Sequence, residues 1–283
     1  MASLKDIKTR IQTVKSTQKI TSAMMMISSA KLKKAQRTIE NLYPYQQKMS
    51  ELTNIFLSSE LDYHSPLAEV REVKRVAIVA FSSNSSLAGR FNNNVIDQFK
   101  ITLDKYKQLG KENILIYPFG DKIAKATRAL GFVPQDNLYD YSENPTYEIG
   151  RVFADKFMTL FLSKKVDEVV LIYHHFKNRA NQVMTVEKFL PIQLKVEGTE
   201  QKPLDFIVEP DKATILNELI PKVLKLKLYT VHADSVTSEH AARTIAMQIA
   251  TDNADDLIFE LTKQHNKLRQ QSITNELLDI VSG

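Results

Sequence analysis

The chain has 283 residues, of which 43% are hydrophobic and 25% charged, and it contains no cysteine. This composition predicts a folded core, and the lack of cysteine excludes disulfides, thiolate chemistry and cysteine-rich zinc sites. The chain has no run of about 18 apolar residues, so no membrane-spanning helix is predicted. The sequence opens at Met1 without a hydrophobic signal region, so we expect a protein kept in a cytosol-like compartment.

The formal net charge of +5 is unevenly distributed along the chain. The first 40 residues hold nine basic and two acidic side chains, so the rest of the chain is close to neutral. A basic helical arm is typical of proteins that bind nucleic acid, an anionic membrane surface or an acidic protein partner. It is equally compatible with a solvated helix face.

The first predicted element is a long helix over residues 1–58, because the first 43 residues contain neither Gly nor Pro. An alternating 3,4 spacing places these residues on one coiled-coil seam: Leu4, Ile7, Ile11, Val14, Gln18, Thr21, Met25, Ser28, Leu32, Ala35, Ile39 and Leu42. The polar residues at its centre weaken this seam. A second apolar stripe, formed by Ile20, Met24 and Ile27, lies off the seam and predicts a second neighbour.

Between about residues 70 and 210 the sequence favours an inserted α/β domain, because short β-branched runs alternate with amphipathic stretches. Strands are predicted over Lys74–Phe81, Asn113–Phe119, Glu168–Phe176 and within Val183–Val196, and helices over Phe91–Leu109, Lys122–Leu130 and Tyr147–Ser163. Residues 197–211 are expected to form a loop or an edge hairpin.

The turn after the first predicted strand, Ser82 to Arg90, is where an open α/β sheet places a ligand. It holds one glycine, Gly89, whereas a phosphate-binding loop needs several, so we expect a structural turn with helix-capping serines. His174 and His175 are neighbours on a predicted strand and should point to opposite faces, which disfavours a shared metal. We expect no cofactor, no metal and no catalytic residue.

The closing element is a second long helix over residues 212–283, since residues 222–282 contain neither Gly nor Pro. At 1.5 Å per residue these positions would span roughly 90 Å, too long for burial against a compact core. The predicted seam comprises Met247, Ala250, Ala254, Leu257, Leu261 and Leu268. Beyond Leu268 the apolar positions shift to Ile273, Leu277 and Ile280, so the tip should leave its partner helix.

Two sets of sequence runs, one at each end of the chain, form a recognisable pattern. In the opening helix these runs are Ile7-Lys8-Thr9-Arg10-Ile11, Val14-Lys15-Ser16-Thr17-Gln18-Lys19-Ile20-Thr21-Ser22-Ala23-Met24 and Ala30-Lys31-Leu32. In the closing helix they are Ser238-Glu239-His240-Ala241-Ala242-Arg243, Ala250-Thr251-Asp252-Asn253-Ala254 and Asn266 through Glu276. Together they resemble one protein family, the gamma subunit of F-type ATP synthases. At Asn84-Ser85-Ser86 the chain departs from that family, which commonly reads Asp-Arg-Gly there.

The resemblance implies a central rotor shaft of the bacterial type. In that fold a long antiparallel coiled coil of the N- and C-terminal helices carries an inserted Rossmann-like α/β domain. The implied partners are the alpha and beta subunits of the catalytic ring, the epsilon subunit and the membrane c-ring, with no nucleic acid and no direct membrane span. The implied location is the cytoplasmic face of the bacterial inner membrane, where the chain would be peripheral and would catalyse nothing itself.

The resemblance also carries residue roles, position by position. Arg269, Gln270, Thr274 and Met24 match positions that contact the beta subunits; Arg10, Lys31 and Arg243 match positions that couple the arms to the ring; Asp205, Phe206 and Glu209 match the foot that meets the c-ring and epsilon.

Three other interpretations remain open from the residues alone. A coiled-coil scaffold with a non-catalytic α/β domain would explain the periodicity and predicts self-association through the seam. A nucleic-acid-binding arm would explain the charge, although no aromatic residue for base stacking precedes Tyr43. A nucleotide-binding enzyme would explain the insert, although it lacks the glycines.

Overall fold

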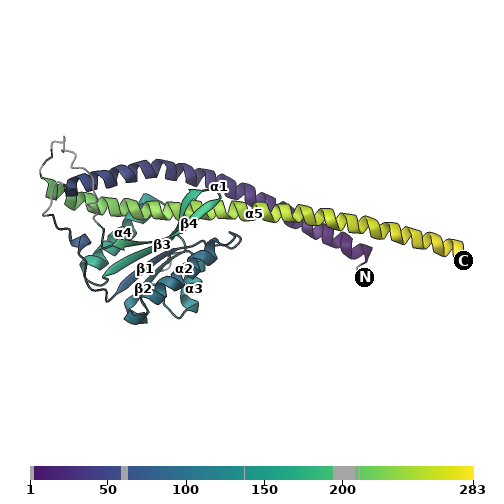
Figure 1. The fold of residues 1–283 in the computed structure, drawn as a ribbon, viewed down its shortest axis with the longest axis horizontal. Helices are drawn as coiled ribbons and strands as arrows, with labels where there is room; N and C mark the ends of the chain where they lie inside the picture. Colours follow the sequence, from purple (N-terminus) through teal and green to yellow (C-terminus); the bar gives the residue numbers. More distant parts are fainter. Residues whose placement is uncertain (1–2, 59–62, 137, 194–207, 210) are drawn as a thin grey trace.

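Two long helices determine the shape of the molecule. The computed structural model describes residues 3–58, 63–136, 138–193, 208–209 and 211–283. Helix α1 (Leu4–Ser58) and helix α5 (Lys212–Ser282) lie side by side along the long axis, as Figure 1 shows. They run antiparallel, because Gln18 hydrogen-bonds Asp255 whereas Thr21, further along α1, meets Thr251, further back along α5.

The seam predicted for α1 is confirmed, because its members are buried or half-buried whereas most positions between them are exposed. Ile7, Leu32 and Ile39 are the most buried apolar members. At the polar centre of the seam, the Gln18 amide donates to Asp255 at 2.8 Å, and the hydroxyls of Thr21 and Thr251 lie 2.8 Å apart. The arms therefore satisfy these polar side chains against each other.

The seam of α5 differs from the prediction at two of its positions. Met247, Ala254 and Leu261 are buried as expected. The intervening positions facing α1 are Thr251 and Ile258 rather than Ala250 and Leu257, and Leu257 is 39% exposed. A heptad pattern is compatible with either pair of positions. Thr251 lies in the seam of the folded chain, where its hydroxyl meets that of Thr21.

The inserted domain contains a four-stranded sheet in the order β2-β1-β3-β4. Strands β1 (Val76–Phe81), β2 (Ile114–Phe119) and β3 (Glu168–Asn178) are parallel, and β4 (Asn181–Leu190) pairs antiparallel with β3. Its helices are α2 (Phe91–Lys105), α3 (Asp121–Ala129) and α4 (Tyr147–Leu162), with short 3₁₀ turns at Pro66–Ala68, Lys107–Leu109 and Lys111–Asn113. The fold class inferred from the sequence is thus confirmed.

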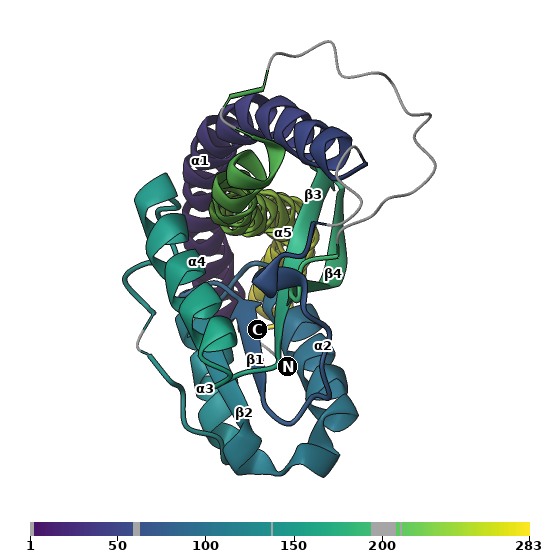
Figure 2. The same cartoon turned by 90° about the vertical axis from the view of Figure 1, so that its left-hand side faces the viewer.

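Each face of the sheet has its own core. Side chains of α2 and α3, such as Phe99 and Ile123, pack on one face with Ile78 and Ile116. On the other face the sheet packs against α4 and the N-terminal part of α5, so α2 and α4 lie on opposite sides in Figure 2. The long helix α5 therefore belongs both to the coiled coil and to the core of the inserted domain.

Element boundaries differ from the predictions for identifiable reasons. β1 starts at Val76 rather than Lys74, because the backbone N–H groups of Lys74 and Arg75 donate to Asp167 instead of to a neighbouring strand. β4 ends at Leu190, directly before Pro191, which has no N–H to donate. The expected strand end at residues 194–196 and most of the expected loop at 197–211 lie outside the described residues.

No helix among the described residues is long and apolar enough to cross a membrane.

Both α1 and α5 contain an internal proline, Pro44 and Pro221. A proline removes one backbone hydrogen bond and commonly bends a helix where it occurs.

Gly150 makes close packing of α4 on α5 possible. A Cβ at this position would lie 2.9 Å from the backbone nitrogen and Cα of Tyr229. We expect Gly150→Ala to destabilise the protein by about 1–3 kcal/mol, because overpacking against backbone outweighs the better helix propensity of alanine. Urea unfolding followed by circular dichroism would measure this loss.

Val152→Ala is the matched control, because Val152 lies on the same helix and is half exposed. Its effect should stay within about 0.5 kcal/mol. Equal stability of Gly150→Ala and the parent chain would contradict the packing described for α4 and α5.

Candidate functional site

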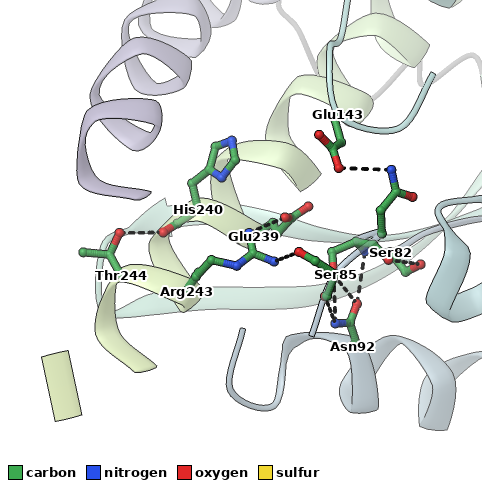
Figure 3. A network of polar contacts seen from close by, with 10 residues as sticks. Ser82, Ser85, Asn92, Glu143, Glu239, His240, Arg243 and Thr244 are labelled. Carbon is green, nitrogen blue, oxygen red and sulfur yellow. Dashed lines mark hydrogen bonds and ion pairs between the residues drawn. The ribbon is translucent and has the colours of Figure 1, made fainter. Parts of the chain in front are cut away.

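A buried ion pair lies where α5 passes the loop that follows β1 (Figure 3). Arg243 and Glu239, one helical turn apart on α5, form the pair, and both side chains are buried. The guanidinium also donates to the hydroxyl of Ser85 at 2.8 Å. Arg243 therefore ties the loop of the inserted domain to the coiled coil.

The loop itself is ordered by Asn92. The Asn92 side-chain oxygen accepts from the Ser83 backbone N–H at 3.0 Å, and its amide donates to the Ser83 hydroxyl at 2.8 Å and to the Ser85 carbonyl at 3.3 Å. Leu87 and Gly89 adopt positive φ, which completes the sharp turn. This arrangement fixes Ser85 in front of Arg243.

The expected helix-capping role of the serines is confirmed in part. The Ser82 hydroxyl accepts from the backbone N–H of Ile123 at 3.0 Å, so it caps α3, the helix after the neighbouring strand. Helix α2, which directly follows the loop, has no side-chain cap at Arg90. Ser82 thus connects the loop after β1 to helix α3 and does not cap α2, the helix that follows the loop.

Burial controls the charges around Arg243. It raises the pKa of Glu239 above its ordinary value, while the nearby guanidinium acts in the opposite direction. Burial also lowers the pKa of His240 to about 4, with Arg243 and Lys31 contributing, so the ring is neutral near pH 7. Within the described part of the chain, His240 Nδ1 has no hydrogen-bond partner.

The residues predicted to couple the arms do not form one cluster. Lys31 of α1 is exposed but close enough to influence the charges of Glu239 and His240, so it belongs to the surroundings of Arg243. Arg10 is exposed and lies 21 positions earlier on α1, roughly 30 Å along the helix. It belongs to the far end of the coiled coil.

The residues predicted for ring contact lie on exposed surfaces. Arg269, Gln270 and Thr274 are exposed on the part of α5 beyond Leu268, and the Thr274 hydroxyl donates to the Gln270 carbonyl at 2.9 Å. The apolar residues of this tip are also exposed: Ile273, Leu277, Leu278, Ile280 and Val281. The expectation that the tip leaves its partner helix is confirmed, as the C-terminal end extends beyond the N terminus in Figure 1.

Met24, the fourth predicted contact, is half-buried on α1. Its neighbours in the second apolar stripe, Ile20 and Ile27, are 60% and 59% exposed. The stripe therefore faces away from α5. Of the predicted foot residues, Glu209 is exposed, and Asp205 and Phe206 lie outside the described residues.

A second polar junction between the insert and the arms was missed by the sequence reasoning. His174 and His175 do point to opposite faces: His174 stacks on Phe91, whereas His175 meets Asp234 of α5. The sequence around Asp234 mixes polar and apolar residues, so no periodic signal marked this carboxylate as buried. Among the described residues, no three His, Asp or Glu side chains form a group able to hold a metal ion.

Comparison with known sequences gives a consistent result over the whole chain. The family model described as ATP synthase matches residues 3–283. The ATP synthase gamma chain of Bacteroides fragilis is 55% identical, covering 100% of this chain and 99% of the relative. Those of Bacteroides thetaiotaomicron and Parabacteroides distasonis are 51% and 46% identical, again covering all of this chain and 99% and 98% of the relatives.

Solved structures share the fold. The central stalk and c-ring structure of the Tetrahymena thermophila mitochondrial ATP synthase contains a chain with a TM-score of 0.57 at 21% identity, covering 82% of this chain and 99% of that one. A chain of the Euglena gracilis mitochondrial ATP synthase has a TM-score of 0.51 at 14% identity, covering 92% and 93%.

Replacing Arg243 should lower the free energy of unfolding, because the buried Glu239 carboxylate then has no cation beside it. We expect Arg243→Met to destabilise the chain by about 3–5 kcal/mol near pH 8, because Glu239 is left buried without its cation. The loss should shrink toward pH 5, since a carboxyl whose folded-state pKa is raised destabilises the fold as pH rises through its range. Urea unfolding at both pH values measures the difference.

The double variant Glu239→Gln with Arg243→Met removes both charges and should recover part of the stability at pH 8. A destabilisation by Arg243→Met that is the same at both pH values would contradict this account of the pair.

Proposed function

Because the chain belongs to the ATP synthase gamma chain family, we propose that it is the central-stalk rotor subunit of an F-type ATP synthase. In this role it couples proton-driven rotation of the c-ring to ATP synthesis and hydrolysis at the surrounding beta subunits. The observation that carries the proposal is the shape of the molecule: a long coiled coil extends well beyond its inserted domain and keeps unpaired apolar surface along its projecting end.

The projecting surface has the properties that a shaft inside a protein ring needs. The stripe of Ile20, Met24 and Ile27 faces away from α5, and the tip of α5 exposes Ile273 and Leu277. Large exposed apolar patches on a folded chain mark interaction sites. The two surfaces come from different arms, so they are suited to different neighbours in the ring.

An asymmetric shaft can drive equivalent neighbours into different states. Each beta subunit would meet a different side of the coiled coil, and each would be biased toward an open or closed form by the difference in its contact free energies. A nearly complete switch needs a differential contact of about 5.5 kcal/mol. A few packed apolar or charge-paired side chains supply that amount, and turning the shaft would exchange the biases.

In this proposal the chain is a non-catalytic subunit. Its buried Arg243 and Glu239 pair with each other, and the partly buried Arg71 pairs with Asp167 at 2.7 Å, so these charges stabilise the fold. The catalytic groups would then belong to the alpha and beta subunits. The nine basic residues among the first 40 would face acidic groups of that ring.

We further propose specific contacts within the complex. Arg269, Gln270, Thr274 and Met24 would contact the beta subunits, and Arg10, Lys31 and Arg243 would take part in coupling; Asp205, Phe206 and Glu209 would form the foot that meets the c-ring and epsilon. The exposure of the tip residues and of Glu209 supports this assignment. The chain would then be peripheral to the cytoplasmic face of the bacterial inner membrane.

A coiled-coil scaffold is the alternative function. It would use the heptad seam to bind a second chain. In this molecule the seam of α1 is already covered by α5 of the same chain, including the paired hydroxyls of Thr21 and Thr251. The intramolecular pairing favours the rotor over a self-associating scaffold.

Reconstitution tests the proposed role directly. Alpha and beta subunits should form a complex with steady ATPase activity when this chain is added, and much less activity without it. A bead or rod attached to the inserted domain should then rotate during hydrolysis. Addition of the chain without effect on activity, or recovery of the chain as a self-associated oligomer, would favour the scaffold.

Deletion of Gln270 to Gly283 should separate folding from coupling. Nearly all of these residues are exposed, so the unfolding midpoint of the truncated chain should stay near that of the full chain. Coupled ATP synthesis in reconstituted vesicles should fall severalfold, because the tip contacts are lost. The substitution Lys263→Ala, at an exposed position before the tip, is the control. Full coupling by the truncated chain would contradict the assigned role of the tip.

A further inference from the structure

A buried carboxylate connects the sheet to both long helices. Asp234 of α5 is 3% exposed. One of its oxygens accepts from the backbone N–H of Phe176 at 2.6 Å, and the other lies 2.7 Å from Nδ1 of His175. The hydroxyl of Tyr43 on α1 lies 3.4 Å from the same His175 nitrogen. Three elements, α1, β3 and α5, therefore meet at one hydrogen-bonded centre.

The centre holds an anchor of the inserted domain. Phe176 is buried among Leu32 and Ile39 of α1 and Ala233 and Ala241 of α5, so the end of β3 packs against both arms through this side chain. Just beyond Phe176 the pairing of β3 with β4 becomes irregular. The Phe176 N–H that Asp234 accepts thus secures the strand where its regular pairing ends.

The centre also contains a group that can exchange protons with solvent. The side chain of His175 is 44% exposed, whereas Asp234 is deeply buried beside it. Burial raises the pKa of the Asp234 carboxyl, and its hydrogen-bond donors act in the opposite direction. A protonated His175 would give the buried carboxylate a charged donor, and charge-assisted hydrogen bonds are roughly twice as strong as neutral ones.

Other titratable groups on α1, β3, β4 and α5 also lie around the centre. Burial raises the pKa values of Tyr43 and Tyr173 above their ordinary range, so both phenols stay neutral. On β4, Glu187 accepts from the Tyr173 hydroxyl at 3.3 Å and forms an ion pair with Lys227 of α5 at 3.0 Å. The pair to consider is therefore formed by the exposed imidazole of His175 and the buried carboxylate of Asp234.

We propose that His175 and Asp234 form a proton-sensitive clamp that holds the end of β3 against α5, with the Phe176 side chain packed on both arms. The clamp is closed when the pair carries one extra proton, because the imidazolium then compensates the buried carboxylate. The clamp loosens when the pair loses this proton, because the buried Asp234 carboxylate then has no cation beside it and only neutral hydrogen-bond donors around it. This inference concerns the chain itself and does not rest on the rotor assignment.

The direction of the pH response follows from proton counting. The closed form binds up to one proton more than the open form, so the ratio of open to closed molecules rises by up to tenfold per pH unit across the titration range. The test compares about pH 6 with about pH 8, on either side of neutrality. A fall in pH closes the clamp and a rise opens it.

A distance measurement on the full chain tests the proposal. The sequence has no cysteine, so Asn41→Cys on α1 and Arg179→Cys at the end of the β3–β4 hairpin can be spin-labelled specifically. Both positions are exposed. Pulsed electron spin resonance should give one narrow distance distribution at about pH 6 and a broader one at about pH 8, with the open fraction increased roughly tenfold.

Three further variants separate the clamp from a merely structural contact. His175→Gln keeps a hydrogen-bond donor but cannot titrate, and it should show no change between the two pH values. His64→Gln, at an exposed histidine away from the centre, should keep the parent response. Asp234→Asn should populate the open form at both pH values; if that variant does not fold, His175→Gln decides. An unchanged distribution in the parent chain, or a normal pH response in His175→Gln, would overturn the proposal.

Discussion

The structure depends on a simple constraint: a helix of 71 residues cannot bury its apolar seam against a compact domain. Helix α5 is on the order of 100 Å long, several times the roughly 30 Å width of a small domain. Only another long helix can cover it, and α1 is that helix. Because the sheet is inserted between two segments that must pair, the arms are antiparallel and the domain hangs from one end of the coiled coil (Figure 1).

Much of the fold could be predicted from the sequence, because the two long helices that dominate it are marked by local signals. Heptad spacing and the lack of Gly and Pro are local signals, so the long helices and the α1 seam were predicted correctly. The choice between Ala250 and Thr251 on α5 was not local, because it depends on the hydroxyl of Thr21, 230 positions away. The start of β1 likewise depends on Asp167, which is distant in sequence and withdraws two N–H groups from the sheet.

The candidate site was predictable in the same uneven way. Arg243 could be identified by resemblance, and exposure of the tip followed from the shift of its apolar positions. Neither signal indicated that Arg243 would donate a hydrogen bond to Ser85 in the loop after β1. Asp234 was overlooked because a single carboxylate in a long helix normally faces solvent, and its burial arises only when the end of β3 packs against α5.

The polar centre of the coiled coil has a mechanical consequence. Apolar seams tolerate sliding, since one leucine packs against another almost equally well, whereas a hydroxyl needs its own partner. If the arms slipped by one heptad, Thr21 could face Ile258 instead of Thr251. The hydrogen bond between the two helices, worth about 0.5–1.5 kcal/mol, would then be lost, while each hydroxyl would keep a backbone carbonyl of its own helix. The Thr21–Thr251 and Gln18–Asp255 contacts therefore oppose sliding of the two helices along their axis. They help a shaft under torque to keep the register between its helices.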